Sequence, residues 1–199
     1  SIYKGRKIVP YCPRCETPLS SHETALGYEN ITEESIYIKF MLLDPKWEGA
    51  KIVAWTTTPW TLLSNVALAA NSDSRYSLLE VEGERLIMAT KLIPNLYEED
   101  EYTKVREFFG ADLMYEKYEP LFPYFEDLKE ENGYIVITAD FVDTEPSSEN
   151  ISTGFVHIAP AFGEDDYNVG KEYSLPFVQP IDEKGIFDEE IPEFGGIIM

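Results

Sequence analysis

Two short stretches of the chain carry the residue types that could do chemistry. The first, residues 54–65, reads AWTTTPWTLLSN and contains three consecutive threonines. Their hydroxyls can both donate and accept hydrogen bonds. The second, residues 154–166, reads GFVHIAPAFGEDD, an apolar run that reaches a histidine and then three acids. Together the threonine peptide (54–65) and the histidine–aspartate peptide (154–166) supply hydroxyls, an imidazole, aromatic rings and carboxylates, which suits a site for a small polar substrate.

Each of these features also has a purely structural interpretation. The threonine run follows an apolar segment, so β propensity and an edge closed by proline would explain it. His157 lies in a hydrophobic run, where it is either a hydrogen-bonded core residue, a pocket wall, a hydrogen-bond donor or a base. Trp60 is either core packing or a flat face for a substrate, or both. The acids at 164–166 complement the dipole of a helix start. The residues alone leave these alternatives open.

The elements that must position the two peptides are mostly strands. Apolar and β-branched runs predict strands at 36–42, 51–55, 65–70, 76–81, 85–89, 134–141 and 155–159. Glu82-Gly83 indicates a hairpin turn, and Asn132-Gly133 precedes the strongest strand. Short helices are predicted at 101–109, ending at Gly110, and from Glu164 to just before Leu175, with a polar loop at 146–150. We therefore expect a β-rich α+β fold, with a barrel-like β core and peripheral short helices.

Composition narrows the classes of protein that the chain can belong to. Its 199 residues, 44% of them hydrophobic and 14% aromatic, are enough for one compact core and argue against disorder. No run of 18 apolar residues predicts a transmembrane helix. Two cysteines, three positions apart, exclude a disulfide scaffold and fit a reducing, cytoplasmic compartment. The start, Ser1-Ile2-Tyr3, is neither an initiator methionine nor a signal peptide, so we interpret the chain as a fragment of a larger protein.

The net charge of −21 argues against an independent nucleic-acid binder. The chain has 37 acids and 16 lysines and arginines, whereas RNA and DNA binders usually present a basic surface to the phosphates. If the chain acts on a nucleic acid, a linked RNA-binding body must deliver it, and such a linkage raises the local concentration to about millimolar. Most of the acids are interpreted as a solvated surface.

Cys12-Pro13-Arg14-Cys15 is half of a zinc site. A closed structural zinc site needs four ligands, and the only other candidates of the usual type are His22 and His157. We therefore expect no complete metal site and no cofactor in this chain.

The two peptides resemble the editing domain inserted into isoleucyl-tRNA synthetase, where the corresponding peptides line a hydrolytic pocket. Thr-Thr-Thr-Pro-Trp-Thr-Leu, followed three residues later by Asn, matches residues 56–65, and His-x-Ala-Pro-x-Phe-Gly-x-x-Asp matches residues 157–166. The Cys-x-x-Cys segment and residues 19–23 resemble the strand that leads into the insertion. Leu63-Ser64 departs from the proline and small residue common in the family, and residues 91–131 are the least recognisable.

The resemblance implies an editing reaction. The expected post-transfer reaction is hydrolysis of the ester that joins a wrongly attached valine to the terminal adenosine of isoleucine tRNA. Valyl-adenylate is a second, pre-transfer substrate. Such a reaction is needed because isoleucine and valine differ by one methylene, which contributes only about 1–3 kcal/mol in a binding pocket. This magnitude is known from isoleucyl-tRNA synthetase itself. Proximity and pre-aimed dipoles can lower the barrier without a covalent nucleophile.

The resemblance also assigns roles to residues. The expected catalytic residues are Thr56, Thr57, Thr58, His157 and Asp166, with Asp166 binding the substrate's amino group by a charge-assisted hydrogen bond. The expected substrate-binding residues are Trp60, Thr61, Asn65, Phe162 and Gly163, with Asn65 holding the loop.

The same resemblance divides the chain into a leading segment, residues 1–27, and one compact editing domain, residues 28–199. It implies as partners the 3′ end of aminoacylated isoleucine tRNA, valyl-adenylate and the rest of the synthetase, with no membrane and a monomeric state. Zinc in the full-length enzyme would use Cys12 and Cys15 with ligands from later chain. Two alternatives stay open: a valyl- or leucyl-type editing domain, disfavoured because those enzymes have Thr-Thr-Arg-Pro here, and a non-enzymatic RNA-docking zinc-ribbon module.

Overall fold

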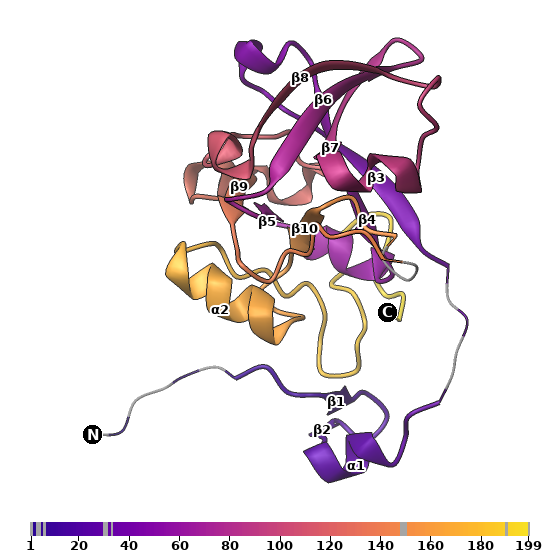
Figure 1. The fold of residues 1–199 in the computed structure, drawn as a ribbon. Helices are drawn as coiled ribbons and strands as arrows, with labels where there is room; N and C mark the ends of the chain where they lie inside the picture. The colour runs from indigo at the N-terminus through magenta and orange to yellow at the C-terminus, as the bar shows by residue number, and fades with distance from the viewer. Residues whose placement is uncertain are drawn as a thin grey trace.

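The protein body consists of two open β-sheets that share one core (Figure 1). The computed structural model describes residues 2, 5, 7–29, 32, 34–147, 151–189 and 191–198. The larger sheet has the order β3 (Ile36–Met41), β4 (Lys51–Thr56), β7 (Glu84–Ala89), β6 (Arg75–Val81), β8 (Thr103–Phe109). The smaller has the order β10 (Phe155–Ile158), β5 (Ala67–Ala70), β9 (Ile135–Thr138). The sheets meet where β4 and β10 lie in contact.

Short helices connect and flank the strands. The longest α-helix among the described residues, α2 (Glu164–Glu172), starts at the acids of the histidine–aspartate peptide, as predicted. The 3₁₀ segments among the described residues are η1 (Pro45–Trp47), η2 (Pro59–Ser64), η3 (Thr90–Asn95), η4 (Gly110–Leu113) and η5 (Pro123–Glu130), the last of which is kinked at Phe125. Because η2 follows β4 after two residues, the threonine peptide turns sharply at the end of a buried strand.

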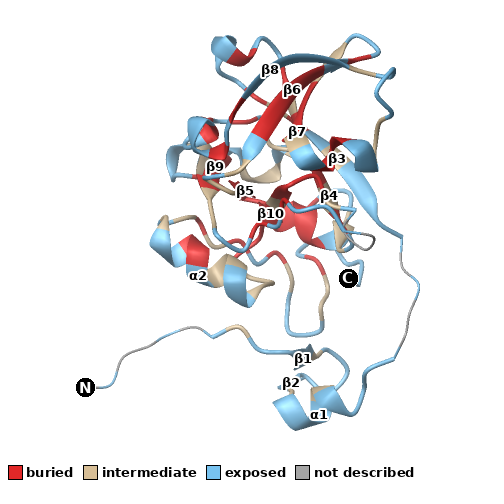
Figure 2. Ribbon diagram, in the orientation of Figure 1, coloured by how far each residue is buried: buried red, intermediate tan, exposed pale blue. Residues whose placement is uncertain are grey.

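The leading segment contains a small unit made of a hairpin and a helix. It contains the hairpin β1 (Tyr11–Cys12) and β2 (Thr17–Pro18) and the helix α1 (Ser21–Ala25), which has no buried residue. Ser20 caps α1 through a capping box with Glu23. Figure 2 shows this unit as largely exposed, in contrast to the buried strands of the body. The proposed division at residue 27 stays a prediction.

The core explains why the two sheets stay together. Apolar side chains of the larger sheet interdigitate with those of the smaller one in a single buried cluster that includes Phe40, Ile52, Leu78, Ile87, Leu68, Val136 and Phe155. At about 25 cal/mol per Å² of buried apolar area, this cluster supplies the main force that holds β4 and β10 beside each other.

A buried tyrosine fixes the start of β10. The Tyr76 hydroxyl donates to the Gly154 carbonyl oxygen at 2.6 Å and accepts from the Asn71 backbone N–H at 2.9 Å. The Tyr76 ring also packs on Phe155, with centroids 4.7 Å apart. Gly154 has φ +81°, and a Cβ there would lie 2.4 Å from the Ala89 Cβ, so only glycine fits this junction.

Most of the predicted strands are confirmed within a residue or a few at their ends, and so is the hairpin turn. Glu82 and Gly83, with φ of 50° and 83°, join β6 to β7, which suits the twist of a two-residue hairpin. Residues 146 and 147 of the predicted loop have no regular structure, and 148–150 lie outside the described residues.

One prediction about the fold was wrong. The helix predicted at 101–109 is the strand β8, which pairs with β6 through a bulge at Leu78/Leu79. Its apolar residues recur at helical spacing, but only Phe108 is buried, and pairing with a distant strand outweighs a weak local pattern.

The fold is β-rich with short helices, as expected, and the barrel-like arrangement of its core stays a prediction. The described strands of the body form two open sheets, in which β4 and β10 lie in contact without a hydrogen-bonded ladder.

Candidate active site

The threonine peptide and the histidine–aspartate peptide line one cavity of about 580 Å³. The end of β4 and the start of η2 form one wall, and β10 with the turn into α2 forms another. The residues that line it are Trp55, Thr56, Thr57, Thr58, Trp60, Thr61, Phe141, Asp143, Ser152, Phe155, Val156, His157, Ala159, Phe162, Gly163 and Asp166. Residues nearly a hundred positions apart in the sequence are therefore brought together, as predicted.

Three threonine hydroxyls form a connected array in this cavity. Thr56 Oγ1 accepts from the Thr58 backbone N–H at 3.1 Å and lies 3.3 Å from Thr58 Oγ1. Thr58 Oγ1 lies 3.3 Å from Thr61 Oγ1. Thr61 donates its proton to the Thr58 carbonyl oxygen at 2.8 Å. These contacts fix the hydroxyls before any ligand arrives, which is what a preorganised polar site requires.

His157 joins the second wall to this array. Its Nε2 lies 3.1 Å from Thr61 Oγ1, and the side chain is almost completely buried. Burial lowers the pKa of His157 from 6.5 to about 4, since desolvation disfavours the charged ring. At neutral pH the cavity therefore contains a neutral imidazole.

The lowered pKa of His157 predicts a pH dependence of stability. Between pH 6.5 and about 4 the unfolded chain binds a proton that the folded chain does not, so stability is complete above this window and falls as pH drops through it. The loss attributable to His157 should be about 3 kcal/mol. Urea unfolding of the protein and of His157→Gln at pH 7 and pH 4.5 isolates this contribution, because all other groups titrate in both. Equal pH slopes in the two proteins would contradict the prediction.

Asp166 lies in the first turn of α2 with its carboxylate folded back toward β10. Asp166 Oδ1 accepts from the Ala159 backbone N–H at 2.8 Å. Burial raises the pKa of Asp166, and the Ala159 N–H partly offsets that rise. A Cβ on Gly163 would lie 2.1 Å from Asp166 Oδ2, so the glycine before α2 makes room for this carboxylate. Asp165, next to it, is exposed.

Most of the residues predicted from sequence line the cavity, but one does not. Thr57 and Trp60 are exposed at its edge, and Phe162 and Gly163 lie at the turn into α2. Asn65 lies outside the cavity lining: its Nδ2 donates to the Ala67 carbonyl oxygen at 2.9 Å, and its Oδ1 accepts from the Tyr118 hydroxyl at 2.7 Å. Asn65 therefore holds the turn from η2 into β5, and its amide is used inside the fold.

Sequence reasoning missed part of the cavity lining. Phe141, Asp143 and Ser152 come from a segment with no motif, and Trp55 and Phe155 lie in the two peptides but were given no role of their own. No local pattern in the sequence indicates that this segment lines the cavity.

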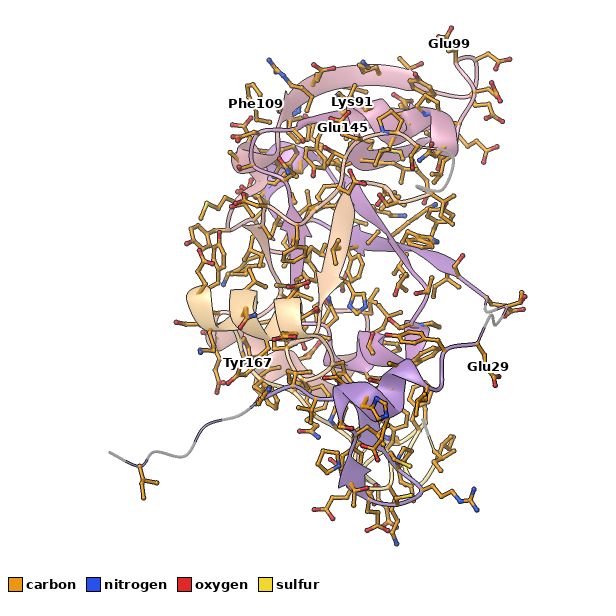
Figure 3. All side chains as sticks on the ribbon, turned by 60° about the horizontal axis from the view of Figure 1, so that its bottom comes forward. Glu29, Lys91, Glu99, Phe109, Glu145 and Tyr167 are labelled. Atoms are coloured by element: carbon orange, nitrogen blue, oxygen red, sulfur yellow. The ribbon has the colours of Figure 1, made fainter. Side chains whose placement is uncertain are left out.

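Several contacts hold the 141–145 segment in place. Ser74 Oγ and Thr144 Oγ1 are 2.6 Å apart, and Asn71 Nδ2 donates to the Val142 carbonyl oxygen at 3.2 Å. An ion pair joins Lys91, at the start of η3, to Glu145 (Figure 3). The segment that carries Asp143 is therefore held against the connection between β5 and β6 and against η3.

The cysteine pair does not make a metal site by itself. Cys12 and Cys15 are free thiols in the β1–β2 hairpin, half-buried and exposed respectively. Among the described residues no group of three or more histidines, cysteines or acids is placed to hold a metal ion. Four ligands would be needed for structural zinc, so the residues present do not fit one.

The described helices are all too short or too polar to cross a lipid bilayer. No protein-family model matches the chain.

Isoleucine–tRNA ligases are similar to this chain over nearly all of its length. The enzyme of Picrophilus torridus is 43% identical over 194 residues, which are 98% of this chain and 18% of the ligase. That of Clostridium acetobutylicum is 44% identical over 198 residues, 100% of this chain and 18% of the ligase. The chain thus spans about a fifth of the length of these relatives.

Solved structures of synthetase editing domains share the fold. The editing domain of the cytosolic leucyl-tRNA synthetase of P. knowlesi superimposes with a TM-score of 0.54 at 13% identity, covering 71% of this chain and 63% of that one. The P. falciparum counterpart gives 0.53 at 10% identity, covering 72% and 68%. The chain therefore corresponds, along nearly its whole length, to one segment of the isoleucine–tRNA ligases, and its fold is that of a synthetase editing domain.

Proposed function

We propose that this chain is the proofreading part of an isoleucyl-tRNA synthetase and hydrolyses valine that has been attached wrongly to isoleucine tRNA. The observation that carries the proposal is that the threonine and histidine–aspartate peptides line one cavity and are joined by the Thr61–His157 contact. The similarity to isoleucine–tRNA ligases supports the choice of substrate.

In the proposed reaction, water attacks the carbonyl carbon of the aminoacyl ester. The bond from that carbon to the ribose oxygen breaks, which releases valine and restores the ribose hydroxyl. Asp166 would hold the substrate's ammonium group, and the hydroxyls of Thr56 and Thr58 would hold the ester and the water in line. Because these groups are fixed by contacts within the fold, they would stabilise the transition state at little reorganisation cost. Valyl-adenylate would be hydrolysed in the same cavity.

The charge of the chain fits a reaction on a delivered tRNA end. The net charge of −21 disfavours independent RNA binding, so the 3′ end would be presented by the remainder of the synthetase, in the cytoplasm. A zinc ion would need ligands from outside this chain in addition to Cys12 and Cys15.

The test is deacylation of valyl-, threonyl- and isoleucyl-tRNA(Ile) side by side. We expect valyl-tRNA to be hydrolysed well above its spontaneous rate and isoleucyl-tRNA to be spared. The assay uses this chain alone and also carried within a complete synthetase, since linkage to an RNA-binding body raises the effective concentration of the tRNA end.

Two results of this test would contradict the proposal. Spontaneous rates in both forms would exclude editing and favour the docking-module alternative. Preferential hydrolysis of threonyl-tRNA(Ile) over valyl-tRNA(Ile) would contradict the proposed substrate and favour an editing domain of the valyl or leucyl type.

A further inference from the structure

Thr61 has one hydroxyl proton and three neighbours that compete for it. Its Oγ1 lies 2.8 Å from the Thr58 carbonyl oxygen, 3.1 Å from His157 Nε2 and 3.3 Å from Thr58 Oγ1. A carbonyl oxygen can only accept a hydrogen bond. The shortest of the three contacts is therefore one in which Thr61 must donate, and this uses its proton.

The remaining two contacts are then determined in direction. Because Thr61 Oγ1 has only lone pairs left, His157 Nε2 must carry a proton and donate it to Thr61. For the same reason the Thr58 hydroxyl donates to Thr61. A neutral imidazole carries one ring proton, so His157 Nδ1 is left as an acceptor. Nδ1 is buried and has no hydrogen-bond partner among the described residues.

We infer that Thr61 holds His157 as the neutral ring protonated at Nε2, so that the one ring nitrogen left without a partner, Nδ1, is an acceptor and not a donor. Thr61 is thus a positioning residue that acts through His157. The inference rests on the proposed function only for the identity of the ligand. Nδ1 would accept a hydrogen bond from a hydroxyl or a water, the two donors that an aminoacylated ribose and its hydrolysis supply. Donation from Nδ1 to an ester carbonyl is excluded.

The surroundings of the ring support the neutral form. His157 is 8% exposed, and burial lowers its pKa to about 4. A protonated ring would donate from both nitrogens, whereas the fold supplies an acceptor at Nε2 only. The other polar groups that line the cavity with His157 include the hydroxyls of Thr56 and Thr58 and the Asp166 carboxylate.

The first experiment is nitrogen-15 NMR of the protein with labelled histidines. The chain has only two histidines, and His22 lies on the exposed helix α1, so it serves as an internal reference that His22→Gln identifies. At pH 7 we expect His157 to show a protonated Nε2 with a hydrogen-bonded proton that exchanges slowly, and an unprotonated Nδ1. A proton on Nδ1, or on both nitrogens, would overturn the inference.

Substitution at Thr61 tests whether this residue keeps the His157 ring protonated at Nε2. Thr61→Val keeps the shape and removes the hydroxyl, so the Nε2 proton should lose its hydrogen bond, shift upfield and exchange faster. Leaving a buried donor unpaired should lower the kcat for valyl-tRNA about 10-fold. Thr61→Ser should restore the proton signal and most of the rate. An unchanged Nε2 proton in Thr61→Val would overturn the role of Thr61.

A pair of substitutions at His157 tests which nitrogen serves the ligand. The amide of asparagine lies near the place of Nδ1, and the longer glutamine side chain brings its amide near the place of Nε2. We therefore expect His157→Asn to retain more deacylation activity than His157→Gln. The opposite order would overturn the role of Nδ1. Because the NMR result does not depend on catalysis, an inactive protein with the expected spectrum would contradict the proposed function and leave the state of His157 established.

Discussion

Asp166→Asn is expected to slow the hydrolysis of valyl-tRNA at least about 30-fold, because it removes one partner of a largely desolvated charge pair, which costs about 2–5 kcal/mol. Asparagine keeps an Oδ1 that can accept from the Ala159 N–H, a bond of 2.8 Å in the structure, so the local fold should survive. The exposed neighbour provides the matched control. Asp165→Asn should leave hydrolysis nearly unchanged, since a surface substitution typically changes the free energy of unfolding by no more than about 0.5 kcal/mol. Equal activity of the two variants, or a larger loss of activity in Asp165→Asn, would show that Asp166 is not the acid that binds the amino group.

Gly163→Ala tests the same carboxylate without removing it. The added Cβ would lie 2.1 Å from Asp166 Oδ2, and the backbone at Gly163, with φ −137° and ψ 144°, accepts alanine. The carboxylate must therefore move, and activity should fall. Gly27→Ala, whose nearest neighbour is 3.8 Å away, is the control for a glycine substitution. Adding Asp166→Asn to Gly163→Ala should cost little more, because both act on one group.

Stability measurements show whether Asp166→Asn loses activity because the fold is damaged or because the carboxylate is missing. Burial raises the pKa of Asp166, so the folded protein keeps this proton to higher pH than the unfolded chain, and the stability that this provides is lost as pH rises through the folded pKa. At neutral pH the ionised carboxylate is therefore unfavourable for folding. Asp166→Asn should leave the free energy of unfolding unchanged or higher while activity falls, as measured by urea unfolding.

Thr58→Trp is expected to abolish the deacylation of valyl-tRNA, with a loss of at least about 100-fold, because displacement of a substrate by about 1 Å already costs that much. Thr58 lines the cavity, is only half-buried and begins η2 without a side-chain capping bond. The indole should therefore enter the cavity and leave the core packing intact. Deacylation kinetics give the loss, and an unchanged thermal unfolding midpoint excludes misfolding as its cause.

The opposite change should widen the substrate range. Trimming the second wall with His157→Ala enlarges the cavity and should let isoleucyl-tRNA be hydrolysed. Thr58→Ser, which keeps the hydroxyl and removes one methyl group, is the conservative control at the first wall. If Thr58→Trp and His157→Ala both discriminate between valine and isoleucine as before, the size gate must lie elsewhere in the protein.

The sequence by itself was sufficient to predict most of the strands and to identify the two peptides that line the cavity. Residues 52–55 and 86–89 are continuously apolar, and Glu82-Gly83 adopts positive φ, so local preference and burial agree on hairpins and buried strands. The same local reasoning failed at β8, where the spacing of Tyr102, Val105 and Phe108 fits a helix. Pairing with β6 overrides that pattern because a ladder of backbone hydrogen bonds to a neighbouring strand is not encoded in local periodicity.

Only the tertiary structure decided how the chemical groups relate to one another. The sequence identified Thr58, His157 and Asp166 as candidates, since their types and order are local properties of the chain. That Thr61 meets His157 at 3.1 Å, that Asn65 is used inside the fold, and that Asp143 reaches the same cavity depend on the packing of β4 against β10 and on the fastening of the 141–145 segment. These are contacts between residues far apart in the chain, and their geometry follows from the core that the two sheets share.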